Sequence, residues 1–264
     1  MKVAIMQPYF FPYLGYFQLI SAVDQFVIYD DVNYINRGWI NRNNILVKGQ
    51  AHRITLPLEN SSQNLHINLI KVSDSGSKLL KTIAQNYNKA PYFDTVFPIL
   101  ECALLHEKKN LHDYLAHQLR VVCGALDIQT KLLISSNLSK DQSLKGQEKI
   151  LAICEELHAS EYINSVGGKS LYERTAFGIR GIQLSFLQTR SVVYTQFGKQ
   201  FSPNLSIIDV LMFNTPEQRR NLLAAYDLQW NDGRPLSLET RLPYLPSQFL
   251  SFRNNHVRIL EKAL

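Results

Sequence analysis

The sequence predicts an α/β protein with a parallel sheet, and its first thirty residues indicate this most clearly. Residues 2–7, KVAIMQ, form a short apolar run that is typical of a strand buried on both faces. Residues 14–25 place apolar side chains at helical spacing, and residues 25–31, QFVIYDD, form a second apolar run that ends in acids. In such a β-loop-α-β unit, the carboxyl ends of both strands meet at one sheet edge, where open α/β proteins usually bind ligands.

The following segments extend the same pattern. Residues 44–49 and 51–58 are strand-like and are separated by Gly49-Gln50, which predicts a hairpin. Three helical patterns come next, and then a second strand, helix and strand within residues 130–190. Thr215, Pro216 and Gln218 have the spacing of a capping box with proline at the first helical position, which predicts a late helix. The predicted elements are helices near 77–88, 94–106, 109–124 and 143–159 and strands in 131–137 and 160–165.

The predicted domain organisation is a single α/β domain over residues 1–230 with a helical insertion near 75–125. Residues 231–264 contain three prolines and mixed polarity, so we expect an irregular C-terminal extension packed on that domain. No apolar run reaches the roughly 18 residues that a membrane span requires, and the chain starts directly with a strand. We therefore expect a cytoplasmic protein.

Charge and composition restrict the class of ligand. A formal charge of +6 is spread along the chain, which suits an anionic small molecule such as a nucleotide or nucleotide sugar at least as well as it suits a nucleic acid. We expect no DNA partner, whereas contact with RNA stays open. The seven histidines lack metal-ligand spacing, and the three cysteines are odd in number and lie in apolar helical patterns. The sequence therefore predicts no protein-bound metal and no disulfide.

The loop that follows the first strand, QPYFFPYLGYFQLI at residues 7–20, has the strongest local signal. Two prolines stiffen it, and Gly15 at the start of the helix leaves room for a ligand to approach the backbone. Tyr13-Leu14-Gly15-Tyr16 has the spacing of the H-x-G-H element with which nucleotidylyltransferases and adenylate-forming synthetases hold ATP phosphates, with tyrosine in place of both histidines. This spacing predicts a nucleotidylyltransferase-like, HUP-type Rossmannoid core.

The aromatic residues of this loop allow two interpretations. They can contact a nucleotide, or Tyr13 and Tyr16 can simply pack in the core. On the first interpretation the phosphate-binding residues are Gln7, Tyr13, Gly15 and Tyr16, and Tyr9 stacks on a base or sugar.

A second candidate segment, YDDVNYINRGWINRN at residues 29–43, follows the second strand. Adjacent carboxylates can bind magnesium, accept an amine or act as a base, whereas arginines bind phosphates and tryptophan stacks on a base or sugar. The alternative is a solvated turn in which aspartates cap backbone N–H groups and pair with arginines. The candidates are Asp30, Asp31 and Asn33 for catalysis, Arg37 and Arg42 for phosphates, and Trp39 for stacking.

Two further segments contribute candidates. In NSVGGKSLY, residues 164–172, Gly168 allows a tight turn and Lys169 can reach a phosphate, although the P-loop spacing is absent and such a turn can also merely start a helix. In LSIIDVLMF, residues 205–213, the pattern is that of a core helix. Asp209 is the exception, because a buried carboxylate needs a partner.

Together, QPYFFPYLGYFQLI, DDVNYINRGWINRN, GGKSLY and LSIIDVLMFN resemble the WbqC-like family, over roughly residues 2–230. This resemblance implies a role in bacterial O-antigen, lipopolysaccharide or related surface-polysaccharide biosynthesis. The reaction it implies is glycine transfer, the acylation of an amino sugar by an amino acid.

On this hypothesis a nucleotide-linked amino sugar accepts an activated amino acid. ATP and Mg²⁺ would be needed if the protein makes the acyl adenylate itself. A donor made elsewhere, such as an aminoacyl-tRNA or a carrier-protein thioester, removes that need. The alternatives are a nucleotidylyltransferase acting on a sugar phosphate and a non-catalytic sugar-nucleotide-binding scaffold.

Overall fold

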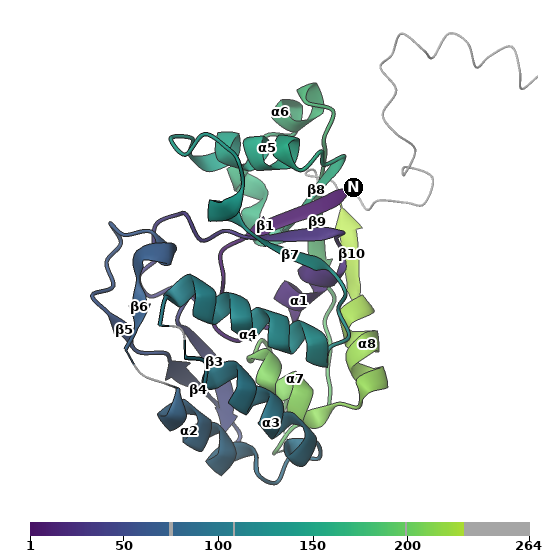
Figure 1. Ribbon diagram of the computed structural model, residues 1–264. Coiled ribbons are helices and arrows are strands. Elements are labelled where there is room, and N and C mark those ends of the chain that lie inside the picture. Colours follow the sequence, from purple (N-terminus) through teal and green to yellow (C-terminus); the bar gives the residue numbers. More distant parts are fainter. Residues whose placement is uncertain (74–75, 108, 199, 230–264) are drawn as a thin grey trace, which may run out of the picture.

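The protein is described by a computed structural model that covers residues 1–73, 76–107, 109–198 and 200–229 (Figure 1). The extension expected at 231–264 lies outside these residues. In the part of the chain that the structure describes, no helix is both long enough and apolar enough to cross a membrane.

A six-stranded sheet forms the centre of the fold, with the strand order β10-β9-β8-β1-β2-β7. Five strands are parallel, and only β10 runs antiparallel to its neighbour β9. The strand order reverses at β1, so the topological switch lies between β1 and β8. The strands are β1 (Lys2–Met6), β2 (Gln25–Ile28), β7 (Lys131–Ile134), β8 (Glu161–Ser165), β9 (Gln183–Thr189) and β10 (Tyr226–Gln229). The α/β class with a mostly parallel sheet is thereby confirmed.

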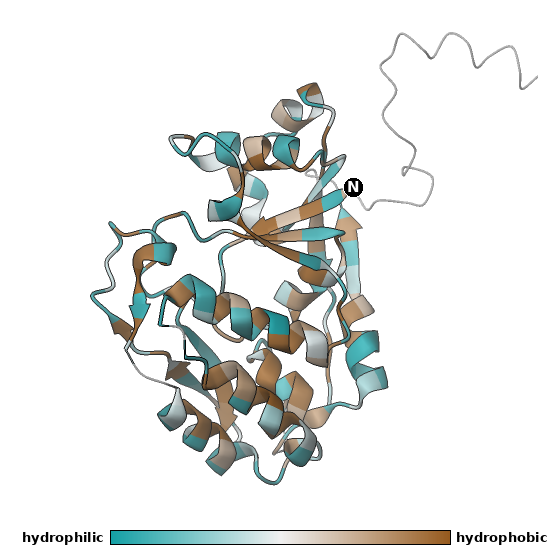
Figure 2. Cartoon of the chain, viewed as in Figure 1, coloured by the Kyte–Doolittle hydropathy of each residue, from teal (hydrophilic) through white to brown (hydrophobic). Residues whose placement is uncertain are grey.

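Helices cover both faces of this sheet, which explains why its strands are apolar on both sides. Val3 and Ile5 pack against α5 (Gly146–Glu156) and α6 (Arg174–Ile179), whereas Ala4 faces the core beneath α1 (Leu14–Ser21), α4 (Leu111–Ala125) and α8 (Pro216–Ala224). Figure 2 shows the hydrophobic colouring concentrated in the sheet and on the helix surfaces that meet it.

A second group of elements extends the core below and to the left of α4 in Figure 1. It consists mainly of the chain between β2 and β7, which includes the helices expected from the sequence, and it also contains a helix that follows β9. Its members are β3 (Arg42–Val47), β4 (Gln50–Thr55), β5 (Leu58–Glu59), η1 (Ile67–Leu69), β6 (Lys71–Val72), α2 (Ser77–Tyr87), α3 (Phe93–Leu104) and α7 (Ile207–Phe213). Two short 3₁₀ helices lie outside this group, η2 (Ser135–Asn137) and η3 (Val166–Leu171).

The predicted hairpin is confirmed with a shift of one residue in its turn. Strands β3 and β4 pair antiparallel, and Val47 lies opposite Gln50. The turn is therefore Lys48-Gly49, with φ angles of 49° and 78°. Positive φ at both central residues is what a tight two-residue hairpin requires, so Gln50 belongs to the strand.

Local helix signals behave as predicted in α7 and α8. Thr215 and Gln218 form the capping box, and Pro216 occupies the first turn. Asp209 is fully buried on α7, and it has the partners that its burial demands: hydroxyl groups of Tyr87 and Tyr194 and the amide of Gln196 donate to its carboxylate.

Candidate functional site

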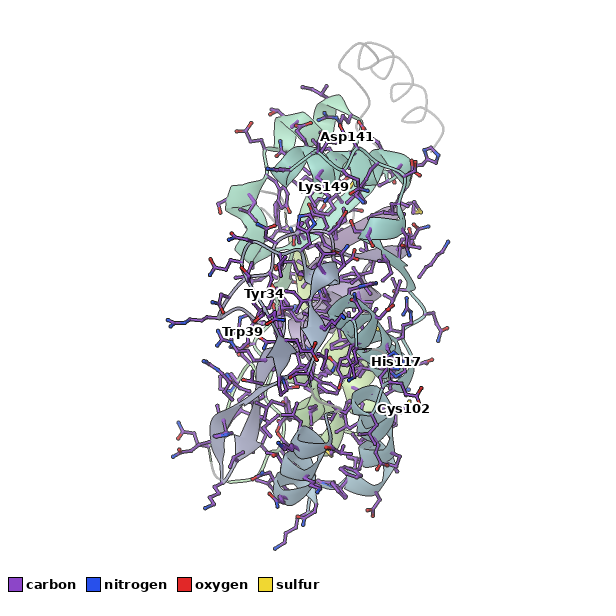
Figure 3. All side chains as sticks on the ribbon, turned by 60° about the vertical axis from the view of Figure 1, so that its left-hand side comes forward. Tyr34, Trp39, Cys102, His117, Asp141 and Lys149 are labelled. Carbon is purple, nitrogen blue, oxygen red and sulfur yellow. The ribbon has the colours of Figure 1, made fainter. Side chains whose placement is uncertain are left out.

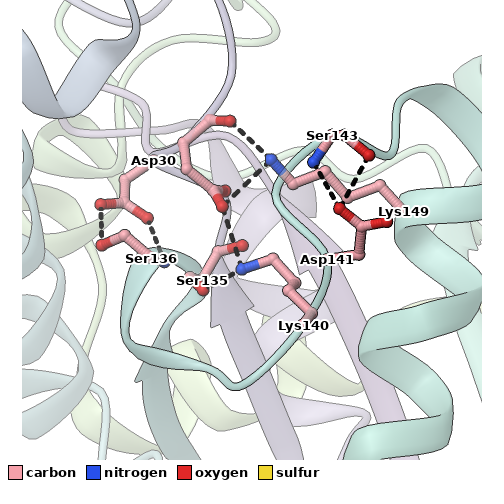
Figure 4. Close-up of polar contacts among 8 residues, drawn as sticks. Asp30, Ser135, Ser136, Lys140, Asp141, Ser143 and Lys149 are labelled. Atoms are coloured by element: carbon pink, nitrogen blue, oxygen red, sulfur yellow. Dashed lines mark hydrogen bonds and ion pairs between the residues drawn. The ribbon is translucent and has the colours of Figure 1, made fainter.

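The two aspartates that follow β2 are held by the loop that follows β7 (Figure 4). Because β2 and β7 are parallel with Ile28 opposite Ile134, the residues beyond their ends also meet. The Ser136 backbone N–H donates to Asp30 Oδ1 at 2.9 Å, and the Ser136 hydroxyl donates to Oδ2 at 2.7 Å. Both oxygens of the buried Asp30 carboxylate are thus occupied.

Asp31 forms a buried ion-pair cluster with two lysines that the sequence analysis did not identify. Its Oδ2 lies 2.9 Å from Lys140 Nζ and 3.0 Å from Lys149 Nζ, and the three side chains are exposed by 5%, 1% and 5% respectively. Lys149 also donates to the Asp31 backbone carbonyl at 2.7 Å, and Lys140 donates to the carbonyl of Ser135. The cluster joins the loops after β2 and β7 to helix α5.

One sequence signal could have revealed Lys149. Lys149 lies one helical turn before Ile153, on a side of α5 where neighbouring residues are buried. A lysine in such a position needs a carboxylate partner. Lys140 carries no comparable signal, because its neighbours Asp141 and Ser143 resemble an ordinary solvated loop.

The charge state of Asp31 follows from these contacts. Burial alone would raise the pKa of the carboxyl, but hydrogen bonds from Ser135, Lys140 and Lys149 outweigh it and hold the pKa below its usual value. Asp31 is therefore ionised at neutral pH and is a weak base. Both of its carboxylate oxygens are buried, so it is suited to hold this cluster together rather than to remove a proton from a ligand.

The aromatic loop after β1 is divided between core and surface. Tyr16 is buried, its ring lies 5.4 Å from those of Tyr9 and Phe26, and its hydroxyl donates to the Gln7 carbonyl at 2.8 Å. Burial raises the pKa of this hydroxyl well above its usual value. Tyr16 is 1% exposed and packs in the core, so its side chain follows the packing interpretation of this loop.

Gly15 is also covered rather than open. A Cβ atom at this position would lie 2.5 Å from the Tyr13 ring and 2.6 Å from the Thr189 hydroxyl, so the absence of a side chain lets these two groups close over the helix start. Tyr13 itself is partly exposed and is tied to Ser206 by a β-bridge. At this edge of the sheet, Tyr13 is therefore an aromatic residue that a ligand can reach.

The Gly-Gly-Lys turn lies at the same carboxyl edge of the sheet, directly after β8, but on the face that α5 and α6 cover. Gly168 is buried against Asn164 and Tyr172, in the 3₁₀ helix η3. Lys169 is half-buried, with Nζ 5.8 Å from the centre of the Phe186 ring and 2.8 Å from Gln229 Oε1. In the described residues its polar partner is a neutral amide and not a carboxylate.

The remaining candidates lie on the loop at residues 33–42 and are mostly exposed. Asn33 forms a β-bridge with His66, and Arg37 is exposed with a φ of 59°. Arg42 Nε donates to the Gly38 carbonyl at 2.8 Å. The Trp39 carbonyl accepts from the backbone of Phe10, which brings this loop beside the aromatic loop. Figure 3 shows Trp39 near Tyr34, below Lys149 and Asp141.

Two open depressions lie outside this arrangement. One, of about 620 Å³, lies where β2 and β7 begin and includes Asp24, Thr130 and Arg220 in its wall. The other, of about 420 Å³, borders Tyr194 and Gln218. Within the described ranges, no three His, Cys, Asp or Glu side chains are grouped to hold a metal ion. The candidate site thus consists of the loops at the carboxyl edge rather than of an enclosed cavity.

Known proteins match most of this chain, including the segments of the candidate site. The WbqC-like protein family matches residues 7–221, which include both loops and the Gly-Gly-Lys turn. The chain is also similar to uncharacterized protein Rv1507c of Mycobacterium tuberculosis (strain ATCC 25618 / H37Rv), with 30% identity over 218 residues that cover 81% of this chain and 93% of the relative. No solved structure matches the chain. The extent of the family match shows that this chain belongs to the WbqC-like protein family.

Proposed function

We propose that this protein transfers a glycyl group to the amine of a nucleotide-linked amino sugar in the biosynthesis of a bacterial surface polysaccharide. Membership of the WbqC-like family supports this class of pathway. The proposal depends most on one structural observation: Lys169, which follows β8, and the exposed Asn33, which follows β2, lie beyond the carboxyl ends of parallel strands on the two sides of β1, next to the topological switch.

The aromatic loop and the Gly-Gly-Lys turn lie on opposite faces of β9. Thr189 closes over Gly15 together with Tyr13 on the face of α1, whereas Phe186, three residues earlier and on the face of α5 and α6, lies beneath the ammonium group of Lys169. Lys169 has no carboxylate partner among the described residues, so its charge is available to a phosphate. Tyr13 adds an accessible hydroxyl and ring. These residues suit the diphosphate and the base of a nucleotide sugar.

The sugar would extend along the edge toward the aspartates. Neighbouring strands are about 4.8 Å apart, so the ends of β8 and β2 are separated by about 10 Å across β1. The exposed Asn33 lies at the far end, where its amide oxygen would accept a hydrogen bond from the sugar amine, and the buried Asp31 anchors the loop behind it.

The chemistry follows from this placement. The amine nitrogen forms a bond to the acyl carbon, and the bond from that carbon to the leaving atom breaks. The leaving atom is oxygen in an aminoacyl ester and sulfur in a thioester, and it takes up the proton lost by the amine. Asn33 would orient the amine, and binding both reactants in one site supplies the proximity on which the rate depends. Lys140 and Lys149 hold Asp31 in its ionised form.

The side chains of Tyr13 and Thr189, which lie over Gly15, restrict how the amino acid donor can be activated. In the H-x-G-H arrangement a phosphate approaches the backbone at this glycine, whereas here Tyr13 and Thr189 fill that space. This arrangement does not fit an ATP phosphate, and it favours a donor that another enzyme has activated. It also weighs against the nucleotidylyltransferase alternative.

A thermal-shift experiment with mass spectrometry tests the proposal. Nucleotide-linked amino sugars should raise the melting temperature of the protein by a few degrees at saturating concentration, since they bind only the folded state. Replacing Lys169 with methionine should abolish most of this shift, because the phosphates lose their cation. Lys81→Met, an exposed lysine on α2, serves as the matched control and should keep the full shift. An equal shift in Lys169→Met would contradict the placement of the phosphates.

One alternative is a scaffold that binds a sugar nucleotide without catalysis. It is favoured by the observation that the carboxylates of Asp30 and Asp31 already have structural partners. Incubation with an activated glycine donor separates the two functions. A product that is heavier by one glycyl group, detected by mass spectrometry, supports transfer. Ligand binding without product under every donor supports the scaffold.

A further inference from the structure

The chain between Asp31 and β5 contains positively charged residues and no acidic residue. Residues 32–58 contain no aspartate and no glutamate, while they contain Arg37, Arg42, Lys48 and Arg53. The nearest preceding carboxylates, Asp30 and Asp31, are buried and engaged by Ser136 and the two lysines. They therefore cannot neutralise this segment.

The β3–β4 hairpin places two of these arginines on one face. Arg42 lies opposite Thr55, and Asn44 lies opposite Arg53. Because side chains alternate along a strand, these four residues share a face, and the intervening pair of Asn43 and Ile54 is buried on the other. Arg42 and Arg53 are thus diagonal neighbours, typically about 7–8 Å apart. In the described part of the chain neither arginine forms an ion pair with a carboxylate, and two positive charges on one face of adjacent strands favour a bound anion.

The loop before the hairpin adds exposed apolar groups beside Arg42. Trp39 is 44% exposed and Ile35 is 52% exposed, and Arg37 lies between them. Arg42 Nε donates to the Gly38 carbonyl, which fixes this arginine beside Trp39 and leaves its remaining N–H groups available. We call the surface formed by Ile35, Arg37, Trp39, Arg42, Asn44, Arg53 and Thr55 the basic hairpin surface.

We propose that the basic hairpin surface binds a single-stranded segment of RNA. Arginine forks bind phosphates in two-pronged fashion, and an exposed tryptophan stacks on an unpaired base. Asn44 and Thr55, on the same face, supply uncharged polar groups for the ribose 2′-hydroxyl. An acidic protein would satisfy the charges but would not use a planar ring flanked by guanidinium groups.

This inference rests on the proposed function and identifies its donor as an amino acid carried on RNA. The basic hairpin surface starts within the segment that leaves β2, and the Trp39 carbonyl is bonded to Phe10 of the loop that leaves β1. An RNA end bound on this surface therefore lies next to the carboxyl edge. RNA binding is measured without any transfer reaction, so its failure would leave transfer from a thioester donor standing.

The test is fluorescence anisotropy with a labelled single-stranded RNA of about 12 nucleotides, titrated at salt concentrations between about 50 and 200 mM. The protein should bind with an affinity that falls steeply as salt rises. Arg53→Ala should weaken binding and reduce the slope of log affinity against log salt by about one, since one phosphate contact is lost. Trp39→Ala should weaken binding by about tenfold with an unchanged slope, because stacking releases no counterions.

The controls make the result decisive. Arg120→Ala removes an exposed arginine from α4, outside the basic hairpin surface, and should bind RNA as the unchanged protein does. Melting temperatures verify that each variant is folded. The assignment would be overturned by equal affinity for DNA of the same sequence, by effective competition from polyglutamate, or by an Arg53→Ala variant that behaves like Arg120→Ala.

Discussion

Replacing Asp31 with alanine is expected to lower the free energy of unfolding by about 3–5 kcal/mol, because the change leaves the ammonium groups of Lys140 and Lys149 buried without a carboxylate. For a chain of this size that loss corresponds to a fall of about 10 °C in melting temperature. Thermal and urea unfolding followed by circular dichroism measure it. The expected effect is large because the cluster links the loops after β2 and β7 to α5.

The pH dependence gives a second measurement on the same residue. The pKa of Asp31 is lower in the folded protein than its usual 3.8, so its contribution to stability is present above about pH 4 and is lost as the pH falls through the folded-state value. The difference in stability between the unchanged protein and Asp31→Asn should therefore shrink on acidification. A constant difference down to pH 2 would show that the carboxylate is not stabilised by its charge.

The matched variants are the lysines themselves. Lys140→Met and Lys149→Met each remove one of two cations from Asp31, so each should cost less than Asp31→Ala. In the double variant Asp31→Ala/Lys140→Met, part of the loss should be recovered, since one unpaired charge is gone. Additive losses would contradict a coupled cluster.

Replacing Asp209 with alanine should destabilise the second group of elements by about 3 kcal/mol. The carboxylate accepts hydrogen bonds of 2.9 Å from Tyr87, 2.8 Å from Tyr194 and 2.6 Å from Gln196. These bonds connect α7 to α2 and to the segment that follows β9, and alanine would leave the buried donors unsatisfied. Hydrogen exchange should show the largest loss of protection in α2 and α7.

The pH response of Asp209 should have the opposite sign to that of Asp31. Burial raises the pKa of Asp209, and the hydrogen bonds from Tyr194, Gln196 and Tyr87 only partly oppose this effect. The folded protein thus holds this proton to a higher pH than the unfolded chain does. Stability contributed by Asp209 should fall as the pH rises from about 3.8 through the raised pKa.

Conservative variants check this interpretation. Tyr194→Phe removes one donor and should cost about 1 kcal/mol. Asp209→Asn keeps the shape and one acceptor, so it should cost less than alanine and should abolish the pH dependence assigned to Asp209. An unchanged pH profile in Asp209→Asn would assign the titration to another group.

The sequence by itself was sufficient for features that depend on near neighbours. The apolar run at residues 2–6, the helical spacing after Leu14 and the capping box at Thr215 and Gln218 act over a few residues, so the β-α-β start, the late helix and the α/β class could be predicted. Asp209 could be recognised as requiring a partner because a carboxylate among the apolar residues of a core helix is costly to bury without hydrogen bonds.

Only the tertiary structure decided which groups meet. The partners of Asp31 are 109 and 118 residues away along the chain, and they come together because β7 pairs beside β2 and α5 packs on the sheet, an arrangement that no local pattern encodes. The closing of Tyr13 and Thr189 over Gly15 likewise joins the ends of β1 and β9. Side-chain spacing is set by local geometry, whereas ion pairing and access to a ligand depend on long-range packing.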